Sequence, residues 1–145
     1  MNSLDNVYTV PERFRDINLS DCELVGMRTL RNTETGSDEV HFQLMLISGA
    51  HADERIPGEL SFPDCATLQL DIDFWEKHYA GNAILEAKCQ KDPDAVAALE
   101  RLDSSRQRIQ RLNEFWLFTI TMHASGGIIR VLARDFMLIA SGEYT

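Results

Sequence analysis

The sequence predicts an α+β fold: an antiparallel β-sheet of about six to seven strands packed against one long helix near residues 93–112. Apolar and polar residues alternate in residues 39–47 and 66–74, and this period of two is typical of half-buried strands. Residues 93–112 instead carry apolar residues at helical spacing. Because strands and helices do not alternate regularly along the chain, a parallel α/β sheet is disfavoured. An antiparallel sheet of this kind can be rolled into a sandwich or a partial barrel.

The remaining elements follow from the same patterns. The predicted strands, in chain order, are 22–31, 39–47, 66–74, 84–90, 114–123 and 127–139. The turn-forming residues 32–38 connect the first two strands as a hairpin. Residues 48–58 contain two glycines, a proline and several charges, which predicts an exposed loop. We expect a single domain over residues 1–145, in which residues 1–16 form a polar arm that lies over the domain or is partly loose.

The strand at 66–74 has the clearest alternation in the chain. Its inward face is predicted to hold Leu68, Leu70, Ile72 and Phe74. Its outward face is predicted to hold Thr67, Gln69, Asp71 and Asp73. We therefore expect Leu70 and Ile72 to be buried and the two aspartates to be exposed.

The start of the helix is also marked. Asp92 can accept hydrogen bonds from the first free amides of the helix, and Pro93 at the first helical position loses no hydrogen bond. The residues Asp103-Ser104-Ser105 are poor helix formers, so a kink is expected there.

An aspartate precedes a cysteine or a phenylalanine at or near the start of three predicted strands. The three pairs are Asp21-Cys22, Asp64-Cys65 and Asp135-Phe136. An aspartate can bond the neighbouring backbone amides and fix a turn. The similarity is too short to indicate a duplication, and we interpret it as recurring turn chemistry.

The charge of the chain disfavours nucleic acid as a partner. Its net charge is −9, which repels phosphate backbones unless basic residues gather in one place. One such gathering is present: four arginines (Arg101, Arg106, Arg108 and Arg111) and Asp103 give residues 101–113 a charge of +3, which leaves −12 for the rest. A run of this kind is more often a solvated helix face than a nucleic-acid site.

Three widely spaced cysteines, Cys22, Cys65 and Cys89, predict three reduced thiols rather than a disulfide framework. The first residues show no signal-peptide pattern, and no apolar run approaches the roughly 18–20 residues that span a bilayer. These observations predict a cytoplasmic protein that does not enter a membrane.

No recognised catalytic, cofactor or metal signature is present. The histidines His41, His51, His78 and His123 are scattered, without the spacing of metal ligands. The small residues at 125–127 lie between two strands rather than before a helix, so they indicate a hairpin turn and not a phosphate site. The sequence therefore predicts no cofactor.

The best candidate for a binding surface is the segment Asp71, Asp73, Trp75 and Glu76. Two outward carboxylates beside an aromatic residue can steer and anchor a protein partner. The leading hypothesis is thus a small acidic, non-enzymatic protein that binds another protein. Bacterial toxin-neutralising (immunity) proteins are one class of this size and acidity, an analogy of class only. A small-ligand-binding β-rich domain and a carboxylate-based enzyme remain the alternatives.

Overall fold

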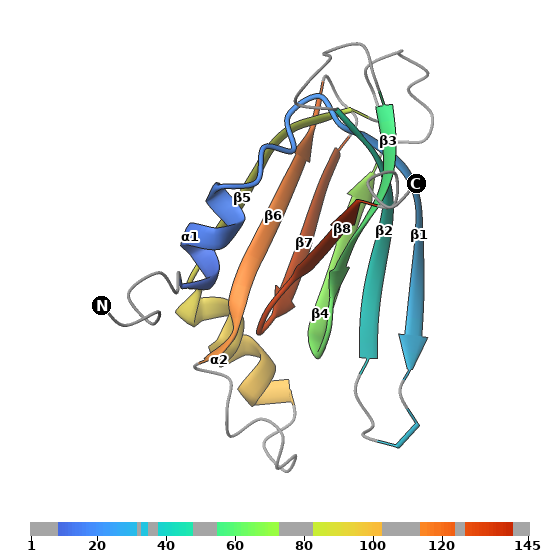
Figure 1. Ribbon diagram of the computed structural model, residues 1–145. Coiled ribbons are helices and arrows are strands. Elements are labelled where there is room, and N and C mark those ends of the chain that lie inside the picture. The colour runs from blue at the N-terminus through green and yellow to red at the C-terminus, as the bar shows by residue number, and fades with distance from the viewer. Residues whose placement is uncertain are drawn as a thin grey trace, which may run out of the picture.

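The computed structural model describes residues 9–31, 33–34, 38–47, 55–72, 83–102, 114–123 and 127–140. These residues form two four-stranded antiparallel sheets that pack face to face, and two short helices lie next to sheet B (Figure 1). Sheet A has the strand order β1 (Glu23–Arg31), β2 (Asp38–Ile47), β3 (Arg55–Phe62) and β8 (Met137–Ala140). Sheet B has the order β4 (Cys65–Ile72), β7 (Gly127–Ala133), β6 (Trp116–Met122) and β5 (Ile84–Gln90).

The predicted α+β class is wrong. The described chain is mostly β, and its two helices are short: α1 (Val10–Arg15) and α2 (Pro93–Leu102). The long helix expected over residues 93–112 is described only to Leu102, directly before the poor helix formers Asp103-Ser104-Ser105, and residues 103–113 lie outside the described residues.

Two strands that the sequence did not predict complete the sandwich. Strand β3 begins at Arg55, inside the predicted loop 48–58, so that prediction is wrong over its last residues. The single strand predicted over residues 127–139 is two strands, β7 and β8, which belong to different sheets. The described residues thus contain eight strands rather than six or seven.

Helix α2 starts as predicted and covers the outer face of sheet B. Asp92 accepts a hydrogen bond from the Ala95 amide at 3.0 Å. Val96 packs on a small apolar cluster that includes Leu117 of β6 and Leu132 of β7. This cluster gives sheet B buried apolar residues on both of its faces.

The main core lies between the two sheets and is built around aromatic rings. The ring of Phe118 (β6) lies 4.8 Å from the Phe62 ring (β3) and 5.1 Å from the Phe14 ring (α1), measured between centroids. Residues 1–16 were predicted to be a polar arm, and α1 lies within that segment with Phe14 buried against the core. The core therefore joins both sheets and α1.

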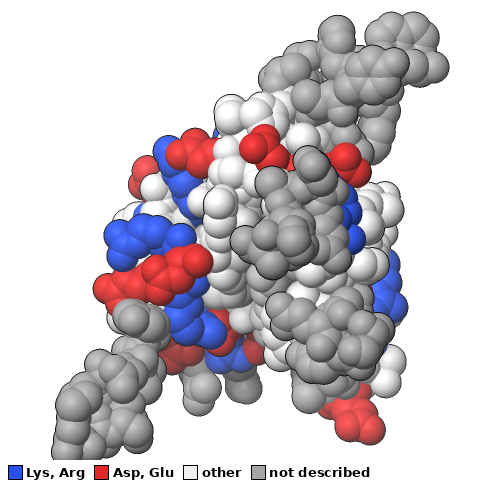
Figure 2. Space-filling model, turned by 45° about the horizontal axis from the view of Figure 1, so that its top comes forward, with Lys and Arg blue, Asp and Glu red and all other residues white. Residues whose placement is uncertain are grey.

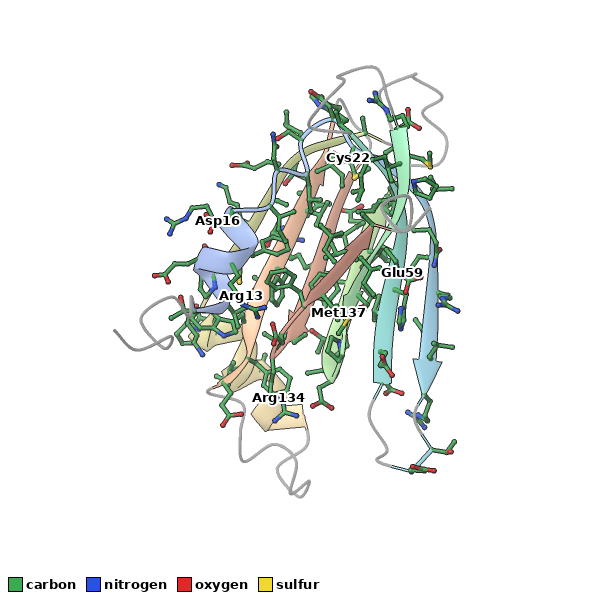
Figure 3. The ribbon with its side chains drawn as sticks, in the orientation of Figure 1. Arg13, Asp16, Cys22, Glu59, Arg134 and Met137 are labelled. Atoms are coloured by element: carbon green, nitrogen blue, oxygen red, sulfur yellow. The ribbon has the colours of Figure 1, made fainter. Side chains whose placement is uncertain are left out.

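The connections between the sheets are fixed by ion pairs (Figure 3). Asp64, in the turn from β3 to β4, has a left-handed backbone (φ 55°) and pairs with Arg134, which lies in the connection from β7 to β8. The next residue, Asp135, pairs with Arg13 of α1 and accepts a hydrogen bond from the Phe136 amide at 2.7 Å. Asp21 also has a left-handed backbone (φ 67°), which agrees with a turn-forming role for Asp21 and Asp64.

Candidate functional site

Of the predicted partner-binding residues, the structure describes Asp71. It lies on β4 opposite Ile128 of β7 and is exposed on the outer face of sheet B, as predicted. Asp73, Trp75 and Glu76 lie outside the described residues, so their role stays a prediction.

The alternation of β4 was predicted correctly, but the burial of Leu70 was not. Leu70 lies opposite Ile129, whose side chain is fully buried on the inner face of sheet B. The Leu70 side chain is nevertheless 41% exposed, and that of Ile72 is half-buried. The predicted inward direction of Leu70 is therefore right. Its exposure must come from the opposite sheet, which does not fully cover β4.

The two sheets are offset sideways, and this leaves one side of the sandwich uncovered. Strand β4 approaches β2 of the opposite sheet, and the edge strand β1 projects beyond it (Figure 1). On β1, Met27 lies opposite the buried Phe42 but is itself 40% exposed, and Thr29 on the same face is exposed. We call this surface, marked by Met27, Thr29 and Leu70, the open side of the sandwich.

The opposite side of the sandwich is closed. There β5 of sheet B lies beyond the short strand β8, and α1 packs against β5 on the inner side (Figure 1). Phe14 of α1 fills this region and is 2% exposed. Within the described part of the chain, no element covers Met27 and Leu70 in the way that α1 covers the core on the closed side, so these two inner-face side chains stay exposed.

Charged residues border the open side. Arg31 at the end of β1 donates to Asp38 of β2 at 2.8 Å, and this hydrogen bond and charge raise the pKa of the Arg31 guanidinium. Arg28 donates to Glu59 of β3 at 3.3 Å on the outer face of sheet A. On the face that Figure 2 draws, basic and acidic side chains also lie next to one another.

A histidine–carboxylate cluster on the outer face of sheet A was missed by the sequence analysis. His41 Nδ1 donates to Glu59 Oε1 at 2.7 Å, and this hydrogen bond is the main cause that lowers the pKa of Glu59. His41 Nε2 is buried and lies 3.4 Å from a Glu39 oxygen, without a hydrogen bond between the two atoms. The alternation in residues 39–47 places His41 on the polar face of that strand, so this residue could have been found from the sequence. Glu59 could not, because a loop was predicted over residues 48–58, directly before it.

The cluster orients the imidazole of His41, but a substrate would have little access to that ring. A neutral imidazole held by a carboxylate can act as a base only where its other nitrogen reaches a substrate. Here that nitrogen is buried and the His41 side chain is 12% exposed. The contacts therefore fit a role in holding β2 and β3 together. The described residues contain no group of three or more His, Cys, Asp or Glu side chains that could hold a metal ion.

The other candidate residues make structural contacts or lie outside the described residues. His123 pairs with Asp21 at 3.0 Å, where the chain entering β1 meets β5. His51, His78 and the arginines at 106, 108 and 111 fall outside the described residues, and nothing is described of the Arg101 side chain. Among the residues described, no helix has the length and apolar character needed to cross a membrane.

The three cysteines are free thiols. Cys22 is buried, and burial raises the pKa of its thiol. Burial likewise raises the pKa of Cys65 and of Cys89 to about 12. Neither thiol is a nucleophile near neutral pH, because the thiolate is the reactive form.

These thiols predict a loss of stability at alkaline pH. In the unfolded chain they ionise near their ordinary pKa of 9.0, whereas folded Cys65 and Cys89 keep their protons up to about pH 12. The unfolded state therefore binds fewer protons between these values, and the free energy of unfolding should fall as the pH rises from 9 towards 12. Urea unfolding across this range should show a shallower fall for Cys65→Ala than for the unchanged protein. Equal slopes would contradict a raised pKa of Cys65.

No known protein family, no curated protein and no solved structure matches this chain. The function must therefore be argued from the surface of the sandwich itself.

Proposed function

We propose that this chain is a small acidic domain that binds another protein, without catalytic activity of its own, through the open side of the sandwich and the adjoining segment that begins at Asp71. The observation that carries the proposal is the half-exposure of Met27 and Leu70, two apolar side chains that lie on the inner faces of their sheets. Apolar side chains in such a position are what a partner can bury.

The charge of the chain supports a partner with a basic surface. The net charge is −9, and Asp71 lies exposed on the strand that also carries Leu70. Charges at the rim of an interface mostly accelerate encounter, whereas apolar anchors hold the complex. Asp73, Trp75 and Glu76 follow directly in the sequence and remain part of the proposed site. Neutralisation of a toxin, the analogy of class drawn above, is one role that such a surface could serve.

The same charge argues against a nucleic-acid partner. A reducing cytoplasm is the proposed location, supported by three free thiols.

The proposal is tested by the kinetics of binding to a partner captured from the native lysate and then purified. Asp71→Lys should slow association several-fold at low salt and flatten its salt dependence, because it removes an attractive charge at the rim. The matched control is Glu86→Lys, which makes the same change of charge at an exposed position of β5 on the closed side. If both variants slow association equally, the effect is one of overall charge and this surface is the wrong one.

A further inference from the structure

The open side combines an edge strand with an uncovered sheet face. Strand β4 pairs with β7 on one side only, and its pairing is regular from Thr67 to Ile72 after an irregularity near Cys65. An edge strand directs alternate amide and carbonyl groups away from its sheet, where they can pair with an added strand. In the described chain no strand occupies that position.

A strand added to β4 would lie across from β1. Neighbouring strands lie about 4.8 Å apart within a sheet, and packed sheets lie about 10 Å apart. Because β1 projects beyond β4, the added strand would face the inner side of β1 and cover Met27 and Thr29. It would also cover the exposed edge of Leu70, as Phe14 of α1 covers the core on the closed side.

The other three edges are less suited to strand addition. Strand β8 is described over only four residues, Met137–Ala140. The start of β5 is already paired, since the Asp21 amide donates to the Ile84 carbonyl at 2.7 Å and the Ile84 amide donates to the Cys22 carbonyl at 2.8 Å. A strand added to β1 would lie further from sheet B, so it would not cover Leu70 and would bury less apolar surface.

We propose that the partner docks as an extended segment that adds to β4 as a fifth strand of sheet B. The added segment carries apolar side chains towards β1 and a basic side chain on the outer face, beside Asp71. The apolar half of this pattern follows from Met27 and Leu70, and the basic half follows from the exposed carboxylate and the net charge of −9. This inference rests on the proposed function and names the form of its partner.

The probe is a displayed library of random peptides, long enough for a strand of about six residues, selected on the wild-type protein. We expect the enriched peptides to alternate apolar and polar residues, with a basic residue at the position beside Asp71. They should lose binding when a central residue is changed to proline, which cannot donate to a strand ladder. Hydrogen exchange should slow at those amides of residues 67–72 that point away from β7 when a selected peptide binds. Strand pairing protects these amides, whereas contact through side chains alone does not.

Two pairs of variants locate the site. Met27→Lys and Leu70→Lys should each weaken the selected peptide at least about tenfold, because each places a charge in the surface that the peptide buries. Leu85→Lys on β5 and Ile139→Lys on β8 are matched controls, since both side chains are similarly exposed outside the open side. They should leave the affinity within about twofold of wild type.

The outcomes separate this inference from the proposed function. If the library enriches no peptide, or if the controls weaken a selected peptide as much as Leu70→Lys does, strand addition to β4 is overturned. If Leu70→Lys weakens the captured protein partner but the amides of residues 67–72 are not protected, the proposed function stands and strand addition is overturned. If the wild-type protein instead forms a dimer that Leu70→Lys abolishes, the occupant is a second copy of this chain and the proposed partner is wrong.

Discussion

Phe118→Ala should lower the free energy of unfolding by about 3–5 kcal/mol. The Phe118 ring is fully buried and packs on rings from three other parts of the chain: Phe14 at 5.1 Å, Phe62 at 4.8 Å and Phe136 at 5.9 Å. Truncation removes these contacts and leaves a cavity that both sheets and α1 border, so no single element can move to fill it. Urea unfolding of the two proteins measures the difference.

The control for Phe118→Ala is Ile139→Ala on β8. The Ile139 side chain is 44% exposed on the outer face of sheet A, so its truncation should change the free energy of unfolding by less than about 1 kcal/mol. The slope of the unfolding free energy against urea concentration should stay the same in both variants, because the surface exposed on unfolding hardly changes. Equal losses of stability in the two variants would show that Phe118 is not central to the core.

The strands that the sequence predicted well are those whose two faces differ. In β2, Val40, Phe42 and Leu44 are buried while the residues between them are not, and its alternation is visible in the sequence alone. Strands β1, β5 and β6 were also placed within one or two residues of their observed bounds. In β2 and β6 the local pattern and the tertiary structure agree, whereas β1 is exposed along most of its length and Leu85 of β5 is exposed.

Strand β3 was missed because it contains two residues that usually interrupt strands, Pro57 and Gly58. Pro57 nevertheless lies opposite Met45 of β2, within a ladder whose register is regular from Val40 to Ile47. Gly58 provides room, since a Cβ atom there would lie 2.5 Å from Leu46 Cδ1. Both residues are therefore compatible with a strand, for reasons that depend on distant parts of the chain.

The division of residues 127–139 into two strands depends on contacts of the same long-range kind. The apolar pattern continues through Phe136, but the chain leaves sheet B at Arg134, which pairs with Asp64 some 70 positions earlier. A local pattern does not reveal such a partner. The open side was hidden in the same way: alternation assigns Leu70 to an inner face, whereas the sideways offset of the sheets leaves both Leu70 and Met27 exposed.

Gly127→Ala should lower the free energy of unfolding by at least about 3 kcal/mol. Gly127 begins β7 with φ 117°, a backbone conformation that side chains with a Cβ atom rarely adopt. A Cβ atom there would also lie 2.1 Å from the Asp71 carbonyl oxygen and 2.7 Å from Ile72 Cα, both of which are backbone atoms of β4. Because backbone atoms cannot rotate away as a side chain can, the pairing at the ends of β4 and β7 has to shift.

Gly26→Ala on β1 is the matched control for Gly127→Ala. Its Cβ atom would meet the end of a flexible side chain, Gln43 Oε1 at 3.0 Å, so the loss should stay below about 1 kcal/mol. Urea unfolding gives both values. Hydrogen exchange of the folded proteins should show faster exchange at residues 67–72 in Gly127→Ala but not in Gly26→Ala, since only Gly127 packs on the backbone of β4. Unchanged exchange at β4 would mean that the strand does not depend on the close approach of Gly127. In that case the proposed docking edge would have to be held in place by the pairing of β4 with β7 further along the strand, from Thr67 to Leu70.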